Sequence, residues 1–65
     1  MNEALKAARD ASGKTQAWVA EKVGISLQMY QRYEYNQNEP SVRTAIRIAD
    51  VLGVKSYQDF KKIFS

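Results

Sequence analysis

The chain has 65 residues, of which 45% are apolar and 26% charged, with a net charge of +3 and a pI of about 9.4. This length allows one small domain, and the composition is typical of a globular protein rather than a disordered one. The chain has no Cys and no His, which excludes disulfides, thiolate or imidazole metal sites, and thiol or imidazole catalysis.

Apolar residues recur with helical periodicity in successive segments, which predicts an all-α fold of five short helices. The first helix is expected over residues 3–12, with Leu5 and Ala8 facing inward. The second and third are expected over residues 16–23 and 27–35, joined by a tight turn at Gly24. Their apolar stripes consist of Val19, Ala20 and Val23 before the turn and of Ile25, Tyr30 and Tyr33 after it.

The fourth and fifth helices are expected over residues 42–52 and 57–64. The apolar positions of the fourth are Val42, Ala45, Ile46, Ala49 and Leu52, and those of the fifth are Tyr57, Phe60, Ile63 and Phe64. Part of the last set must cover the core. The remainder is either intramolecular as well or a surface for a second copy of the chain.

Residues with special backbone roles fall at the expected helix ends. The three glycines, Gly13, Gly24 and Gly53, each follow a helix, where a left-handed conformation is often needed. Hydroxyl residues that can accept a hydrogen bond from a free backbone N–H stand at four helix starts: Thr15, Ser26, Ser41 and Ser56. Ser56 with Asp59 also has the spacing of a weak capping box.

Long amide and guanidinium side chains lie between the apolar positions of the third helix. They are Gln28, Gln31 and Arg32. Gln pairs with adenine and Arg with guanine through two hydrogen bonds in the major groove. On an isolated helix such residues are usually ordinary exposed helix formers. A packed helix pair that displays them predicts a reader of DNA sequence.

Residues 16–35 resemble the helix-turn-helix of the phage lambda and 434 repressor and Cro (XRE-like) family. The resemblance is carried by the small Ala20, by Gly24 at the turn, and by the apolar stripes described above. It extends to residues 5–9, 34–36, 40–42 and 45–53, and so covers nearly the whole chain.

The resemblance implies base contacts from Leu27, Gln28 and Arg32 and a phosphate contact from Gln16, and the positions of the other polar residues beside them indicate similar roles. The third helix would enter the major groove, with base contacts from Leu27, Gln28, Gln31 and Arg32. Leu27 is suited to a thymine methyl group. Phosphate contacts would come from Thr15, Gln16, Tyr35, Gln37 and Arg43. Gln16 would be helped by the positive end of its helix.

The resemblance also implies a structural ion pair between Arg9 and Glu34. Trp18 stands where relatives often carry Glu, so it either covers the core or forms an exposed patch for a partner. Tyr30 and Tyr33 are larger than the usual aliphatic residues, and we expect their hydroxyls to reach the surface or a partner.

The function predicted from the sequence is a sequence-specific transcriptional regulator, a repressor of phage or mobile-element type. It would bind a pseudo-palindromic DNA operator as a homodimer in the cytoplasm. An alternative is an antitoxin-like module that binds a partner protein as well as DNA, and the chain could also be the N-terminal domain of a longer protein. No enzyme, cofactor, metal, small-molecule substrate or membrane partner is expected, since the carboxylates are not paired, no apolar run reaches ~20 residues, and the N-terminus lacks a signal.

Overall fold

Five helices form along the part of the chain that the computed structural model describes, residues 1–64. They are α1 (Glu3–Ser12), α2 (Gln16–Val23), α3 (Leu27–Glu34), α4 (Val42–Val51) and α5 (Tyr57–Phe64). The predicted all-α fold is confirmed. Helices α3 and α4 each end one residue earlier than expected, because Tyr35 and Leu52 serve as their caps.

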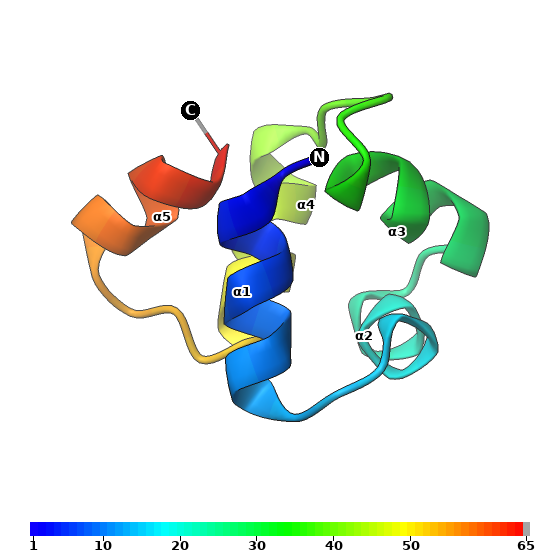
Figure 1. Ribbon diagram of the computed structural model, residues 1–65, viewed down its shortest axis with the longest axis horizontal. Coiled ribbons are helices and arrows are strands. Elements are labelled where there is room, and N and C mark those ends of the chain that lie inside the picture. Colours follow the sequence, from blue (N-terminus) through cyan, green and yellow to red (C-terminus); the bar gives the residue numbers. More distant parts are fainter. Residues whose placement is uncertain (65) are drawn as a thin grey trace.

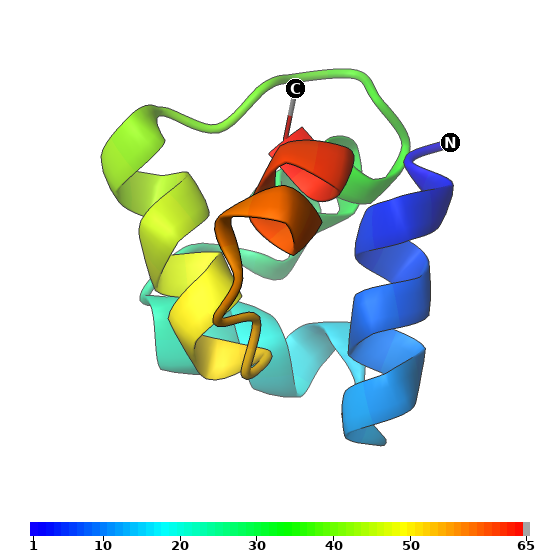
Figure 2. The same cartoon turned by 90° about the vertical axis from the view of Figure 1, so that its left-hand side faces the viewer.

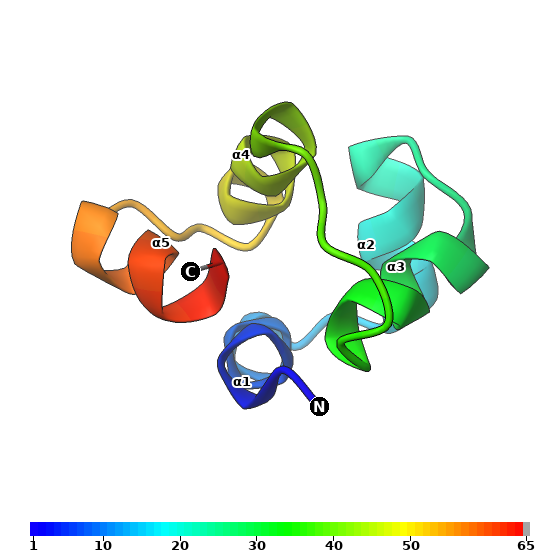
Figure 3. The ribbon, with the colours of Figure 1, turned by 90° about the horizontal axis from the view of Figure 1, so that it is seen from above.

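The helices surround one core, with α1 in the centre of Figure 1 and α4 behind it, so that the two lie on opposite sides of the domain in Figure 2. Helix α2 packs against α3 and α4, and α1 packs against α5 and α3. The longest dimension of the domain is 27 Å, and α3 and α5 lie at its opposite ends (Figure 3). Buried apolar side chains that contact one another form the core cluster, which consists of Leu5, Val19, Ala20, Val23, Tyr30, Ile48 and Ile63.

The core face of α4 is rotated from the apolar stripe seen in its sequence. Ala45 and Ala49 are buried as expected, but Val42 is 75% exposed and Ile46 is 49% exposed. Ile48, which is not part of that stripe, is completely buried. Helix α4 is therefore apolar over a wider arc than its neighbours cover.

The predicted hydroxyl caps are confirmed. Thr15, Ser26, Ser41 and Ser56 each accept a hydrogen bond from the backbone N–H three residues later, at 3.0 to 3.2 Å. The end of α3 is fixed by Asn36, whose φ of 58° is left-handed. Asn36 N–H donates to Tyr33 O and Gln37 N–H to Arg32 O, so the free carbonyls of the last turn are satisfied. Helix α3 thus has defined ends, with Ser26 capping its start and Asn36 following its last turn.

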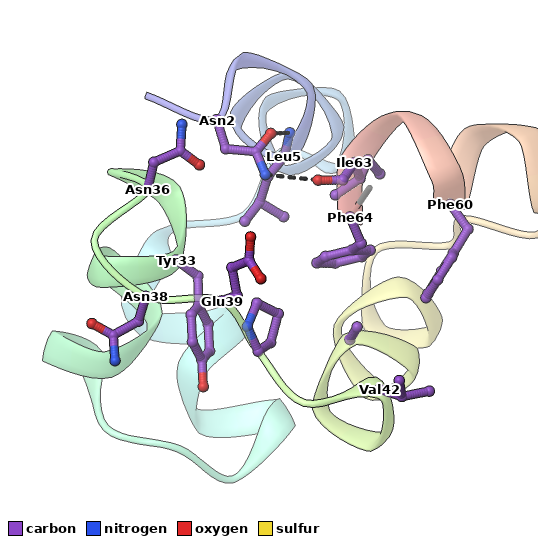
Figure 4. Close-up of a pocket in the computed structure, with 12 residues that line it drawn as sticks. Asn2, Leu5, Tyr33, Asn36, Asn38, Glu39, Val42, Phe60, Ile63 and Phe64 are labelled. Carbon is purple, nitrogen blue, oxygen red and sulfur yellow. Dashed lines mark hydrogen bonds between the residues drawn. The ribbon is translucent and has the colours of Figure 1, made fainter.

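Asn2 closes the fold from the N-terminus, a role that the sequence analysis missed. Its side-chain oxygen accepts from Leu5 N–H and caps α1, while its backbone N–H donates to Glu34 O at 2.7 Å. Its Nδ2 donates to Ile63 O, also at 2.7 Å. These bonds tie α1 to the ends of α3 and α5. They lie beside a pocket of about 160 Å³ that Tyr33, Glu39 and Phe64 also line (Figure 4).

Candidate nucleic-acid interface

Helices α2 and α3 are joined by a turn in which backbone geometry sets their crossing. Gly24 has a φ of 89°, which residues with a side chain rarely adopt, and Ile25 N–H donates to Ala20 O at 3.0 Å. Val19 and Val23 of α2 and Tyr30 of α3 are buried together in the core. One side of α3 is therefore held against the domain, while its other side faces solvent.

The solvent-facing side of α3 collects most of the residues that were expected to read bases. Leu27 is 39% exposed, and Gln28 and Arg32 are exposed as well. Gln31 differs, because it is half-buried and its Nε2 donates to Gln16 Oε1 at 3.2 Å. The outward surface of α3 thus combines an apolar side chain, an amide and a guanidinium.

The residues expected to contact phosphates lie around this surface. Some of them are exposed, and others are hydrogen-bonded within the domain. Tyr35 and Gln37 follow the end of α3, Arg43 lies in the first turn of α4, and all three are exposed. Gln16 is half-buried and turned inward, since its Nε2 donates to Glu34 Oε1 at 3.0 Å. The Thr15 hydroxyl accepts from Trp18 N–H and caps α2.

A buried ion pair connects α3 to α1. Arg9 Nε lies 2.6 Å from Glu34 Oε2, and the two side chains are only 13% and 1% exposed. Arg9 also donates to Lys14 O at 3.0 Å, so it holds the turn before α2 as well. Burial by itself would raise the pKa of Glu34. The hydrogen bonds from Arg9 and Gln16 and the nearby Tyr30 hydroxyl outweigh it and keep this pKa below its ordinary value.

The two tyrosines of α3 differ in environment. Tyr30 is completely buried, and within the described part of the chain its hydroxyl has no partner at hydrogen-bonding geometry. The expectation that this hydroxyl reaches the surface or a bonded partner was therefore wrong. Burial, followed by the nearby Glu34 carboxylate, raises the pKa of Tyr30. Tyr33 is half-buried and packs at the edge of the core.

Trp18 takes the first of the two roles that the sequence left open, because it covers the edge of the core. It is half-buried and packs against the core cluster. The ammonium groups of Lys14 and Lys22 lie over its ring, at 4.7 Å and 5.6 Å from the ring centroid. These distances are within the range of cation–π attraction.

A separate apolar surface lies between α4 and α5. Val42, Ile46 and Tyr57 are exposed there, and with Val54 and Phe60 they line a shallow groove, which we call the α4–α5 groove. Charges of both signs, Asp50 and Lys55, lie at its edge. Sequence periodicity placed Val42 and Ile46 on a helix but gave no sign that both are exposed.

Residues 1–64 offer no group of three or more His, Cys, Asp or Glu side chains that could hold a metal ion. No helix in this range is both long and apolar enough to cross a membrane. The features that stand out on the surface are therefore the exposed side of α3 and the α4–α5 groove.

Comparison with known proteins agrees with this geometry. The helix-turn-helix family model matches residues 5–59, which include α2, the turn and α3. The chain belongs to the helix-turn-helix family. No solved structure matches it significantly.

Curated proteins that the chain resembles include three transcriptional regulators, and the names of two of them refer to a phage or a prophage. The chain is 39% identical over 54 residues to the cryptic phage CTXphi transcriptional repressor RstR of Vibrio cholerae, covering 83% of this chain and 48% of RstR. It is 35% identical over 54 residues to the SPbeta prophage-derived uncharacterized HTH-type transcriptional regulator YonR of Bacillus subtilis, covering 83% and 50%. The uncharacterized HTH-type transcriptional regulator YqaE of the same species is 38% identical over 53 residues, covering 82% and 46%. The chain thus spans about half the length of these relatives.

Proposed function

We propose that this helix-turn-helix domain is a sequence-specific, DNA-binding transcriptional repressor of phage or mobile-element type. The observation that carries the proposal is the exposed side of α3. It presents Leu27, Gln28 and Arg32 on a helix that α2 and the Arg9–Glu34 pair hold in place. The similarity to a phage repressor and to a prophage-derived regulator supports it.

In this mechanism α3 enters the major groove and its exposed side chains touch base edges. Arg32 is suited to guanine N7 and O6, Gln28 to adenine N6 and N7, and Leu27 to a thymine methyl group. Tyr35, Gln37 and Arg43 would bind phosphates, together with the N–H of Gln16 that Glu34 leaves free. An occupied operator then blocks RNA polymerase in the cytoplasm. Binding alone carries this mechanism, without a catalytic step or a cofactor.

We further propose that two copies of the chain pair through the α4–α5 groove. Its exposed apolar residues remain without cover within the described domain, and its edge carries both charge signs, so a two-fold pairing can oppose Asp50 to Lys55. Helix α5, whose Tyr57 and Phe60 line the groove, lies at the opposite end of the 27 Å axis from α3 (Figure 3). If two domains are joined at the α5 end, the distance between their α3 helices is more than one and less than two times the 27 Å length of a domain. This interval includes the ~34–36 Å between major-groove surfaces one helical turn apart.

The DNA-reading function is tested by selection from a random DNA pool at fixed, near-physiological salt, with the wild type beside Gln28→Ala and Arg32→Ala. We expect a two-fold motif from the wild type. In each variant, the preference for one base at one position of each half-site should fall by roughly 5- to 150-fold, the value of one bidentate pair. The absence of any enriched motif would refute the DNA-reading function. The same motif from all three proteins would refute the assignment of these side chains.

Pairing is tested by sedimentation of the wild type and Ile46→Glu with and without the selected operator. A charge among the apolar residues that line the groove should abolish the dimer and weaken operator binding, while an isolated half-site is still bound. Ala7→Glu makes the same change in net charge at an exposed position of α1, away from the groove, and should leave the dimer intact. An unchanged dimer in Ile46→Glu would exclude this surface.

A second candidate function is an antitoxin-like module whose α4–α5 groove seats a different protein. The same exposed Val42, Ile46 and Tyr57 favour it. A wild type that stays monomeric on its selected DNA site would favour this candidate over the homodimer.

A further inference from the structure

A row of hydrogen bonds runs from the buried ion pair to the edge of the exposed side of α3. Glu34 Oε1 accepts from Gln16 Nε2 at 3.0 Å, and Gln16 Oε1 accepts from Gln31 Nε2 at 3.2 Å. Glu34 itself is fixed by Arg9, whose Nε lies 2.6 Å from Oε2. The row therefore joins α1, α2 and α3 through side chains alone.

The direction of every bond in this row is set by the carboxylate. Ionised Glu34 can only accept, so Gln16 must turn its NH₂ group toward it. This leaves the Gln16 oxygen facing Gln31, so Gln31 must donate to it from its own NH₂ group. Reversing either amide would place two oxygens against each other, which costs free energy in a partly buried site. The amide orientations of Gln16 and Gln31 thus follow from the ion pair.

Gln31 occupies the border between the two sides of α3. Tyr30 and Glu34 on one side of it are buried, and Gln28 and Arg32 on the other side are exposed. One N–H of Gln31 is committed to Gln16, which leaves its carbonyl oxygen and its second N–H. An oxygen beside an N–H is the pair of groups that matches adenine N6 and N7 in the major groove.

We propose that Gln31 is a specificity-determining residue whose amide, oriented by Glu34 through Gln16, selects adenine at one position of each half-site. Gln16 is then a positioning residue for that base contact, in addition to any phosphate that it binds. The inference rests on the proposed DNA-reading function. Guanine and thymine present a carbonyl oxygen where adenine presents its amino group, so the fixed Gln31 oxygen disfavours both.

The test compares three isosteric variants with the wild type in the same random-pool selection: Gln31→Met, Gln16→Met and Gln58→Met. Gln58 lies exposed on α5 and is the matched control. We expect one adenine position to be relaxed by roughly 5- to 150-fold in Gln31→Met, and the same position to be relaxed in Gln16→Met. Gln58→Met should leave the motif unchanged. Thermal melting verifies that each variant is folded.

The outcomes separate the inference from the function on which it rests. A wild type without a motif would refute the DNA-reading function itself. If the wild type reads a motif but Gln16→Met weakens all sequences evenly, Gln16 contacts only phosphate and the inference is wrong. Retention of every base preference in Gln31→Met would overturn it as well.

A measurement on the free wild-type protein needs no variant. In NMR spectra the side-chain amide protons of Gln16 and Gln31 that are hydrogen-bonded should exchange with water more slowly than those of the exposed Gln28 and Gln58. Equal exchange rates for all four amides would show that the row of hydrogen bonds does not persist in solution, and would exclude the proposed orientation.

Discussion

Near one end of the domain α3 is held by a buried polar network, whereas near the other end α4 and α5 leave apolar side chains exposed. Arg9, Glu34 and Gln16 are joined by directional hydrogen bonds, so this end permits one orientation of α3. Val42 and Ile46 have no such constraint and little burial. The first region therefore fixes the orientation of α3 within the domain, whereas the exposed side chains of Val42 and Ile46 contribute little to folding.

The largest expected effect comes from removing the cation of the buried pair. Arg9→Met leaves the Glu34 carboxylate, only 1% exposed, without its charged partner. We expect a loss of about 3–5 kcal/mol in the free energy of unfolding, measured by urea denaturation. Lys6→Met breaks the exposed pair with Asp10 on the same helix and should have a much smaller effect. Equal losses in both variants would contradict the special role of the buried pair.

Acid should weaken the same region. The pKa of Glu34 is lower in the folded protein than its ordinary value of 4.5, so folding favours the ionised form. The resulting stabilisation is fully present above about pH 4.5 and is lost as the pH falls through the folded-state pKa. Urea midpoints measured from pH 7 to pH 2.5 should show the stability gap between wild type and Glu34→Gln narrowing toward acid. A constant gap would contradict the lowered pKa.

A smaller effect is expected from the Tyr30 hydroxyl. Tyr30→Phe removes a buried oxygen that makes no hydrogen bond of good geometry among the described residues, so the free energy of unfolding should change by only about 0–1 kcal/mol. Tyr30→Ala, which also empties the space of the ring, should cost about 3–5 kcal/mol. A large loss in Tyr30→Phe would show that the hydroxyl is bonded to Glu34 in solution.

The smallest effect is expected in the α4–α5 groove. Ile46→Ala should change the unfolding free energy of the monomer by about 0.5 kcal/mol or less, because Ile46 is 49% exposed. The same substitution two residues later, Ile48→Ala, should cost about 2–5 kcal/mol, because Ile48 is fully buried. Both are compared at a protein concentration where the wild type is monomeric. Similar losses would remove the contrast between the two sides of α4.

The helices were predictable from sequence because their signals are local. Thr15 and Ser26 cap the helices that follow them, and Gly24 takes the left-handed conformation of the turn, all within a few residues along the chain. The end of α3 is local as well, but Tyr35 caps the helix instead of extending it, so the helix ends one residue earlier than expected.

The features that the sequence did not predict depend on contacts between distant segments. The Asn2 side chain donates a hydrogen bond to Ile63 O, 61 positions away in the chain, and the periodicity of apolar residues cannot predict such a contact. Ile48 and Ile46 have the same side chain, and only the placement of neighbouring helices decides which is buried. Gln31 looked like a free base reader because Gln16, fifteen positions earlier, gives no sign of pairing with it.

Trp18 has a practical consequence, since it is the single tryptophan of the chain. Two ammonium groups over its ring give the fluorophore a positive local potential that salt can screen. Iodide, an anion, should therefore quench its emission more strongly than caesium, and the difference should shrink as ionic strength rises. The domain thus has a natural optical reporter on α2, able to register an approaching polyanion without a chemical label.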